Sequence, residues 1–431
     1  EAALQAAADQ RRAQMGADRS GAITVAGITA SAVDNPFLRR AAGPEPGAPR
    51  DAVAEDIERE LQALREETGT RLVAAPSIRS RSGSGGIDRL NEVSTAIEAS
   101  GVPGRLGGRL ALRANVVAAS SGDLQNDVET RRRFGSNVLA GPTAGSGSSD
   151  TTATGVGLDL AWRRGNFAAD IGTTPLGFRL TNLVGGLEVA PRLTDNLRLR
   201  VTGERRAVTD SLLSWSGVRD PVSSRIWGGV VRSGGRAQLE YAAGPANFYA
   251  GGGYASFEGS GVVDNNRIEG GAGMSYAVYR RPDDELTAGL DLVYFAYDRN
   301  LRHFTLGHGG YFSPQSYAAL NLPVDWRARS GDLSWHLGAT LGFASWREDT
   351  VDVFPGDPAR QGQLVGAAAG DPTIRTRYAG QSQSGFTGGV RGDVEYALTP
   401  QLRLGAALRY DRAADWNEAR GTFYLRYRPE N

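Results

Sequence analysis

Three histidines are the first candidates for chemistry, because histidine is the side chain that most often moves protons in catalysis. His303 and His308 fall in one long predicted loop, and His336 follows Ser334 by two residues in a predicted strand that begins after Asp332. Serine, histidine and aspartate are the components of a nucleophilic triad. Neighbours on one strand do not place the base against the nucleophile with suitable geometry, so the trio predicts no triad. A lipase or protease remains an alternative, and we expect no enzyme activity.

Metal and cofactor sites find little support in the sequence. The spacing of Asp349, Asp352 and Asp357 does not form a calcium-binding loop. There are no cysteines, which excludes disulfides and thiolate metal sites. The glycine pairs within 227–229 and 251–253 do not precede helices, so they are not phosphate-binding loops. We therefore expect no metal and no cofactor.

Composition narrows the class of protein. The 431 residues contain 48 basic and 48 acidic side chains, so the net charge is zero and nucleic acid is not favoured as a partner. Glycine occurs 58 times, nearly twice its usual share of about 7%. No run of about 18 apolar residues predicts a membrane-spanning helix. A membrane barrel is still compatible with the polar average, because only one face of its strands is apolar.

The elements that must position these side chains are strands. A strand has a side-chain period of two, and residues 333–344 alternate strictly between an apolar and a small or polar face. The apolar residues of that stretch are Leu333, Trp335, Leu337, Ala339, Leu341 and Phe343. The alternation continues for about eleven residues, the length that a tilted strand needs to cross a bilayer.

Sixteen segments of this kind follow one another. They begin near residues 70, 87, 106, 153, 166, 181, 196, 226, 247, 266, 285, 315, 333, 384, 401 and 419. Short turns alternate with longer connections, of which the longest are 120–152, 207–225, 299–314 and 348–383. This is the pattern of an up-and-down barrel with short periplasmic turns and long outer loops. An even number of strands places both chain ends on the periplasmic side.

We therefore predict an all-β fold: a 16-stranded antiparallel up-and-down outer-membrane β-barrel over residues 69–431, preceded by a short helical segment. A soluble β-sandwich or propeller is the opposing interpretation. Strand length and the alternation of loops argue against it, as do aromatic residues at strand ends, which we interpret as membrane girdles. These aromatic residues are Trp162, Tyr241, Tyr297, Trp346 and Tyr410.

Residues 1–68 differ from the rest of the chain. Asp51 can cap a helix whose apolar residues Val53, Ile57, Leu61 and Leu64 share one face. We expect a short amphipathic helix here, with a linker rich in glycine and proline before it.

The polar residues, which alternate with the apolar ones along each strand, are expected to face the lumen. A barrel of sixteen strands has room for an aqueous channel there. Mixed arginine and carboxylate walls can hydrogen-bond a passing hydroxyl-rich chain, although such charges often only brace the wall as ion pairs. The predicted lumen contacts are Arg109, Arg113, Arg198, Arg200, Glu204, Asp291, Asn321, His336, Arg391, Asp393, Glu395, Arg403 and Arg409. We expect loops 120–152, 299–314 and 348–383 to act as gates.

Four segments, within 79–90, 204–214, 227–235 and 311–324, resemble the C-terminal region of the cellulose synthase operon protein C family. The resemblance covers roughly residues 70–428. It implies a 16-stranded barrel in the bacterial outer membrane, with its N-terminus in the periplasm and tetratricopeptide repeats before it. Residues 1–68 would be the end of that repeat region and a linker; they show no 34-residue period, so we expect the chain to be truncated or processed.

The resemblance also implies a function. The barrel would export a nascent β-1,4-glucan (cellulose) chain from the periplasm to the cell exterior. Its partners would be the glucan, the inner-membrane cellulose synthase complex with its periplasmic subunits, and outer-membrane lipid. Two alternatives stay open, an exporter of another exopolysaccharide and a general solute porin. Carboxylates accompany the arginines of the predicted lumen, which favours a neutral glycan over a strongly anionic one.

Overall fold

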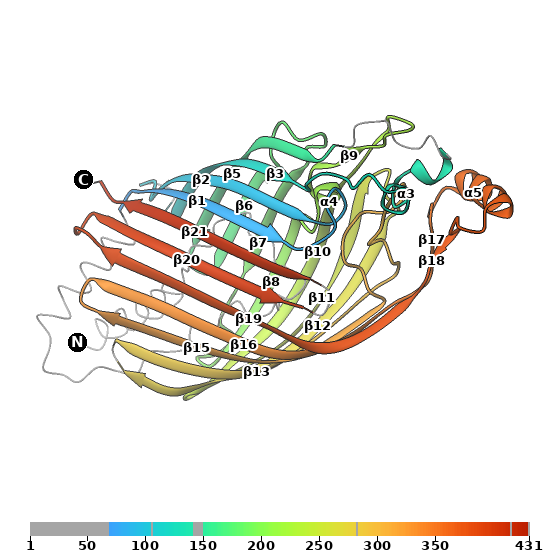
Figure 1. Ribbon diagram of the computed structural model, residues 1–431. Helices are drawn as coiled ribbons and strands as arrows, with labels where there is room; N and C mark the ends of the chain where they lie inside the picture. The colour runs from blue at the N-terminus through green and yellow to red at the C-terminus, as the bar shows by residue number, and fades with distance from the viewer. Residues whose placement is uncertain (1–68, 105–106, 141–149, 282, 414–415, 430–431) are drawn as a thin grey trace, which may run out of the picture.

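The computed structural model describes residues 69–104, 107–140, 150–281, 283–413 and 416–429. Within them the chain forms one closed barrel of sixteen antiparallel strands (Figure 1). The predicted helix over residues 51–68, and with it the proposed division at residue 69, lies outside the described residues.

The strands follow one another around the barrel in chain order, each paired with its predecessor. They are β1 (Arg71–Arg81), β2 (Leu90–Gly101), β3 (Arg109–Ser120), β5 (Thr152–Arg164), β6 (Phe167–Thr173), β7 (Leu183–Val189), β8 (Leu197–Ala207), β10 (Ile226–Ala243), β11 (Ala246–Ser260), β12 (Asn265–Arg281), β13 (Asp284–Tyr297), β15 (Ser316–Ser330), β16 (Leu333–Glu348), β19 (Gln381–Ala397), β20 (Leu402–Arg412) and β21 (Asn417–Tyr427). The last strand pairs with the first, with Tyr427 opposite Leu72, and this closes the sheet.

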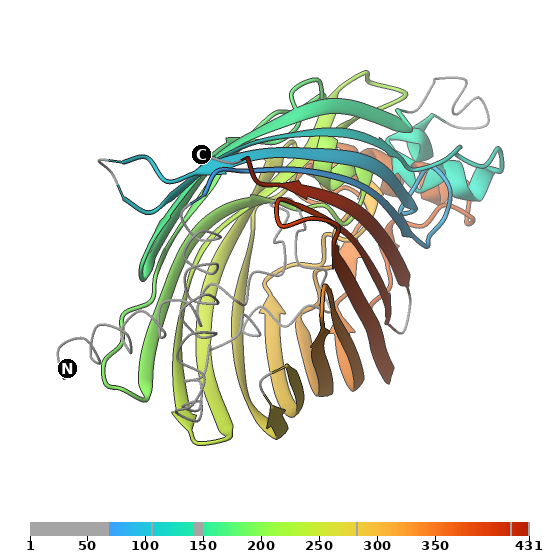
Figure 2. The same ribbon diagram turned by 90° about the vertical axis from the view of Figure 1, so that its left-hand side faces the viewer.

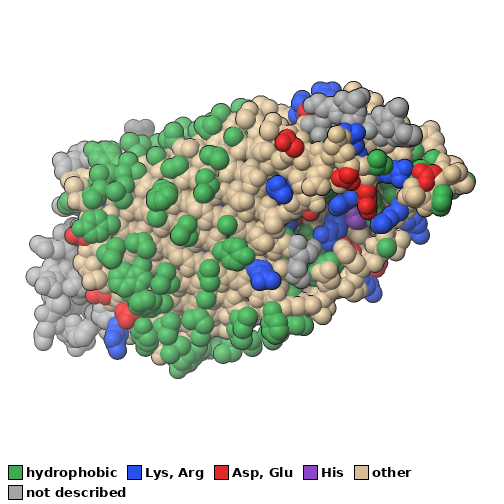
Figure 3. Space-filling model, in the orientation of Figure 1, with side chains coloured by type: hydrophobic (Ala, Val, Ile, Leu, Met, Phe, Trp, Pro, Cys, Tyr) green, Lys and Arg blue, Asp and Glu red, His purple; other side chains and the backbone are tan. Residues whose placement is uncertain are grey.

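The predicted fold class is confirmed, and the predicted strand starts fall within three residues of the observed ones. The alternation that predicted the strands also separates the two faces of the wall. On β16, Leu341 and Phe343 point outward and are 58% and 46% exposed, whereas the inward Ala344 and Trp346 are buried. Figure 3 shows such outward side chains as a broad apolar belt over the strands. An apolar belt around a polar interior is the arrangement of an outer-membrane barrel.

The two ends of the barrel differ. At the end that holds Arg71 and Tyr427, the connections are the short ones: 102–108, 165–166, 190–196, 244–245, 282–283, 331–332 and 398–401. Figure 2, turned by 90° from Figure 1, brings this end to the viewer. No helix among the described residues is long and apolar enough to cross a bilayer.

Four of the connections at the far end, the longest ones, carry short elements of their own. The β3–β5 loop contains α3 (Val128–Arg132), β4 (Phe134–Gly135) and the 3-10 turn η1 (Asn137–Leu139). The β8–β10 loop contains α4 (Leu212–Ser216) and β9 (Val218–Arg219), and the β13–β15 loop contains β14 (Phe304–Thr305). The β16–β19 loop contains β17 (Val351–Asp352), α5 (Pro358–Gly370) and β18 (Arg377–Tyr378). Their apolar side chains join one buried cluster with the inner wall at this end.

Candidate functional site

Loops from opposite walls of the barrel meet over its far mouth. Phe304 and Thr305 of β14 pair in parallel with Phe134 and Gly135 of β4. Counting around the sheet, β13 is the eighth strand after β3 (β5, β6, β7, β8, β10, β11, β12, β13), half of sixteen. The β4–β14 pairing therefore crosses the mouth from one side to the other. We refer to the β3–β5, β8–β10, β13–β15 and β16–β19 loops together as the roof.

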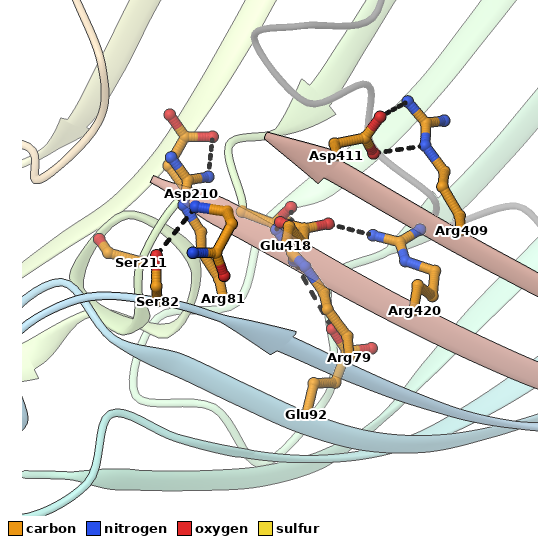
Figure 4. Close-up of polar contacts among 12 residues, drawn as sticks. Arg79, Arg81, Ser82, Glu92, Asp210, Ser211, Arg409, Asp411, Glu418 and Arg420 are labelled. Carbon is orange, nitrogen blue, oxygen red and sulfur yellow. Dashed lines mark hydrogen bonds and ion pairs between the residues drawn. The ribbon is translucent and has the colours of Figure 1, made fainter. Parts of the chain in front are cut away.

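The β8–β10 loop also crosses the barrel, from β8 to the inner face of β1. Arg79 Nη1 donates a hydrogen bond to Thr209 Oγ1 at 3.4 Å. Arg81 Nη1 lies 3.7 Å from Asp210 Oδ1 (Figure 4). Five strands separate β1 from β8 along the sheet. The same Asp210 accepts a hydrogen bond from the backbone N–H of Phe312 in the β13–β15 loop at 3.1 Å. One carboxylate thus joins two loops and the wall.

Helix α4 forms the centre of the roof. Ser211 caps it through its side chain, which accepts from Ser214 N, and all five residues of α4 are buried. Ser211 Oγ also donates to the carbonyl of Gly310 at 2.7 Å. Gly310 has φ +65°, and a Cβ there would lie 2.9 Å from Ser211 Oγ. Glycine is therefore needed at position 310 both for its backbone conformation and for this close approach.

Two further contacts join the β8–β10 loop to its neighbours. Asp220 accepts hydrogen bonds from Ser136 N at 2.8 Å and Ser136 Oγ at 2.6 Å, which ties it to the β3–β5 loop. Trp215 of α4 packs edge-on against Phe178, with ring centroids 5.3 Å apart, in the segment that joins β6 to β7. This loop was not among the predicted gates, yet it contacts both the β3–β5 and the β13–β15 loop of the roof.

His303 and His308 lie inside the roof, where the β13–β15 and β16–β19 loops meet. The His303 ring stacks on Tyr378 at 3.7 Å, and His308 Nε2 lies 3.2 Å from the carbonyl of Asp352. Burial lowers the pKa of His303 to about 2, with the positive charge of Arg302 acting in the same direction, and lowers the pKa of His308 to about 3. Both rings are therefore neutral at pH 7. Nε2 of His303 and Nδ1 of His308 are buried and have no hydrogen-bond partner among the described residues.

Below the roof, the inner wall carries networks of ion pairs that span neighbouring strands. Arg200 on β8 donates through Nε to Glu240 on β10 at 2.8 Å and also pairs with Glu188 on β7. Glu204, on the same face of β8, pairs with Arg232 of β10. A chain of alternating charges therefore runs across β7, β8 and β10.

A second network spans β15, β16 and β19. His336 lies between two carboxylates, with Nε2 2.7 Å from Asp325 Oδ1 and Nδ1 3.1 Å from Asp393 Oδ1. Arg391 also reaches Asp325 Oδ1, at 2.6 Å. The hydroxyl of Ser334, by contrast, lies 3.5 Å from the carbonyl oxygen of Glu395. Both ring nitrogens of His336 thus face carboxylates and not a serine nucleophile.

The predicted lumen residues all lie on the inward parity of their strands, but they form several separate groups. Near the short-turn end, Arg109 donates to Ser100 Oγ at 2.9 Å, and Arg113 pairs with Glu98 and Asp159. Arg198 faces Glu240 in register, and Asp291 faces Asn321 in register and accepts a hydrogen bond from the hydroxyl of Tyr249. Glu395 pairs with Arg403 and Arg426, and Arg409 pairs with Asp411. These contacts brace the wall, and a role in touching solute stays a prediction.

Two residues assigned to the outer aromatic girdles belong to the inner wall instead. Tyr297 and Trp346 are 7% and 5% exposed and pack among other aromatic side chains under the roof. Tyr241 and Tyr410 do face outward, at 47% and 42% exposed. The alternation along each strand could have shown this, because Tyr297 and Trp346 each lie an odd number of residues from the outward leucines of their own strands and so point inward.

Among the described residues, no three His, Asp or Glu side chains are placed to hold a metal ion.

Comparison with solved structures supports the barrel architecture. A structure described as a bacterial polysaccharide outer membrane secretin matches with a TM-score of 0.51 and 12% identity, covering 84% of this chain and 99% of that one. At this identity the likeness concerns the fold alone.

Comparison of sequences gives the family. "Cellulose synthase 2 operon protein C" of Komagataeibacter xylinus is 38% identical over 88% of this chain and 28% of its own length. "Cellulose synthase operon protein C" of Pseudomonas fluorescens (strain SBW25) is 33% identical over 84% of this chain and 27% of its own length. The chain thus spans little more than a quarter of these relatives. The family model for the cellulose synthase operon protein C C-terminus matches residues 88–430, and the chain belongs to this family.

Proposed function

We propose that the chain forms the outer-membrane channel through which a nascent β-1,4-glucan (cellulose) chain leaves the periplasm. The observation that carries the proposal is a 16-stranded barrel with a polar inner wall in a chain of the cellulose synthase operon protein C family. The paired charges of the wall offer hydrogen-bond donors and acceptors to a hydroxyl-rich chain, and because they are paired they give the wall no large net charge. Its role is transport and not catalysis.

The lengths of the connections support an orientation for the barrel. In outer-membrane barrels the short turns lie in the periplasm and the long loops outside. The end with Arg71 and Tyr427 would then face the periplasm, with residues 1–68 on that side, and the roof would face the exterior. An inner-membrane cellulose synthase complex, with its periplasmic subunits, would supply the chain and the driving force.

The roof favours a gated exporter over a general porin. A porin needs a standing aqueous path, whereas here loops from opposite walls pair across the mouth and bury a shared apolar cluster. Passage of a glucan requires these loops to part. The β8–β10 loop, with its contacts to β1 and to the β3–β5 and β13–β15 loops, is the central element of this gate.

Export in cells tests the proposal. The native export subunit of a cellulose-producing bacterium is replaced by one that carries this barrel, and cellulose outside the cells is measured. A control version lacks the barrel but retains the periplasmic portion, and the two strains are compared at equal cellular amounts of the subunit. We expect external cellulose only with the barrel. Equal amounts of external cellulose from both strains would refute the proposal. So would a barrel that exports no cellulose but restores export of another glycan in cells that lack the exporter of that glycan.

A further inference from the structure

Arginines are concentrated in one sector of the inner wall, on the last three strands of the barrel and on β1, which pairs with β21. Eight arginines and four carboxylates face inward from these four strands. Six of the arginines form two rows, which we call together the arginine stripe. The upper row, in register from β19 to β1, consists of Arg391, Arg409, Arg420 and Arg79, and the lower row, nearer the short turns, consists of Arg403 and Arg426.

The arginines of each row oppose one another on neighbouring strands. Like charges that lie directly opposite in a sheet repel each other. Glu418 relieves part of this repulsion in the upper row, where it pairs with both Arg79 and Arg420 (Figure 4). Glu395 is likewise shared by the two arginines of the lower row. Because both of these carboxylates are shared and arginines are in excess, further negative charge against the stripe would stabilise it.

The wall between the two rows is low. Ala407, Thr422 and Ser77 are in register there, and all three side chains are small. The ring of Tyr424 lies over Gly405, where a Cβ would come within 2.0 Å of the ring. On β20 the rows are separated by six positions, which at about 3.4 Å per residue is about 20 Å. A chain segment can therefore lie against this stretch of wall with its charged side chains close to both rows.

An acidic segment precedes β1. Residues 51–67 contain seven carboxylates and two arginines, an excess of five negative charges. Arg109, which faces inward on β3, donates a hydrogen bond to the carbonyl oxygen of Gly69 at 3.1 Å, so the chain passes the inner side of the wall as it enters β1. Even at the helical rise of about 1.5 Å per residue, residues 51–67 would extend about 26 Å, farther than the separation of the rows. The segment has the charge, the length and the attachment point to reach the stripe.

We propose that residues 51–67 dock along the arginine stripe, from the periplasmic mouth, in a barrel that holds no glucan. The carboxylates of the segment then lie against arginines that face one another. The direct link through Gly69 to β1 keeps the segment at a high effective concentration beside the stripe. The docked segment fills the part of the lumen beside β19, β20, β21 and β1. This inference goes beyond the export function and does not depend on which polymer the barrel carries.

Crosslinking between cysteines tests the docking directly, because the chain has no cysteine of its own. Gln62→Cys is combined either with Ala407→Cys, between the two rows on β20, or with Thr202→Cys, which faces inward on β8. Counting around the sheet, β20 is the eighth strand after β8, so position 202 lies on the opposite wall. The purified 431-residue chain in detergent is treated with a short bifunctional thiol reagent, and the crosslinked form is measured by its mobility on gels. We expect most molecules to join positions 62 and 407, and few to join 62 and 202.

Charge changes in the segment test the cause of the docking. Glu58→Gln, Glu60→Gln, Glu66→Gln and Glu67→Gln together remove four ion-pair partners, and we expect the rate of 62–407 crosslinking to fall about tenfold. Salt at about 1 M, where the screening length is about 3 Å, should lower the rate in the parent as well. Arg59→Gln/Arg65→Gln is the matched control in the same segment. It removes two charges that the stripe repels, so the rate should stay the same or rise.

The proposal is refuted if position 62 joins both walls equally, or if neither the neutral variant nor salt lowers the rate of 62–407 crosslinking. Crosslinks between two chains, in place of those within one chain, would show that the stripe binds a second copy and would also overturn the proposal. Resistance of the barrel to detergent on unheated gels checks the folding of each variant. If the neutral variant does not fold, the salt series on the chain with cysteines at 62 and 407 provides the test.

Discussion

Arg81 and Asp210 join two distant parts of the barrel: Nη1 of Arg81, on the first strand, lies 3.7 Å from Oδ1 of Asp210, in the loop after β8. Their side chains are only 9% and 18% exposed, so little water screens the pair. The two residues are 129 positions apart in the chain, by subtraction of their numbers. The contact ties the centre of the roof to the wall.

Removing this carboxylate should loosen the roof. Asp210→Ala loses the ion pair with Arg81 and the hydrogen bond from Phe312 N, and a hydrogen bond to a charged group contributes about 1.5–3 kcal/mol. We expect the ratio of open to closed channels in planar bilayers to rise about tenfold or more. Asp195→Ala, in an exposed turn at the opposite end, serves as control. An open probability that is the same in both variants and the parent would contradict the role of Asp210.

Acidification should also open the roof. His303 and His308 are neutral when buried, with pKa values lowered to about 2 and about 3, whereas an exposed histidine has a pKa of about 6.5. Protonation of these two histidines therefore favours the open arrangement of the loops, in which their rings are exposed to water. The closed roof has its full stability above about pH 7 and loses it as the pH falls below about 6.5, by up to about 1.4 kcal/mol per pH unit for each histidine.

Conductance at pH 7.5 and pH 5 measures this effect. The nearby charges of Arg302 and Arg133 stay positive over that range and disfavour protonation in the closed state. The His303→Gln/His308→Gln variant takes up no proton at these positions, so its conductance should be nearly independent of pH. An identical pH dependence in the variant and the parent would show that other groups control the opening.

The ion-pair networks of the wall should contribute to stability. Arg200→Ala removes the arginine that pairs with the buried carboxylate of Glu240, and breaking a buried pair in this way costs about 3–5 kcal/mol. We expect a lower free energy of unfolding in urea with lipid vesicles. Changing Glu240 to Gln as well should restore much of the loss. If Arg200 only guides the glucan, export would fall while the unfolding free energy stayed constant.

The apolar belt should not accept a charge. Leu408 on β20 is 70% exposed on the outer face, and an arginine facing lipid near the bilayer centre costs about 2–4 kcal/mol. We expect Leu408→Arg to reduce the folded barrel recovered from outer membranes and its unfolding free energy in vesicles. Val365→Arg, on the exposed face of α5 in the roof, is the comparison and should have little effect. Equal losses in both variants would contradict the position of the belt.

The wall of the barrel was predictable from sequence because its signal is local. Side-chain alternation depends on neighbours two residues apart, and turns are marked by nearby Gly, Pro and Asp. The inward position of Arg113, Arg200 and His336 follows from the same parity. The same alternation places Tyr297 and Trp346 on the inner face. They were wrongly assigned to the outer girdles because they are aromatic residues at strand ends.

The roof was not predictable in the same way, because its contacts join distant segments. Pairing of Phe134 with Phe304 and docking of Asp210 on Arg81 leave no periodic mark in the sequence. Loop length alone indicated which connections could cover the mouth. It could not show that the β8–β10 loop, of moderate length, lies at the centre. The ion-pair partners of the wall, such as Glu240 for Arg200, depend on register and required the structure.

The most direct test of the central claim is whether a glucan passes along the inner wall. A photo-crosslinking amino acid is placed either at Asp393, whose inward side chain is 41% exposed, or at the next residue, Val394, which is 42% exposed on the outer face. Cells that synthesise cellulose are then illuminated, and the barrel is examined for a cellulase-sensitive increase in mass. We predict this adduct at position 393, only while the synthase is active, and none at position 394. Equal labelling at both positions, or none at 393 while cellulose leaves the cells, would contradict passage through this lumen.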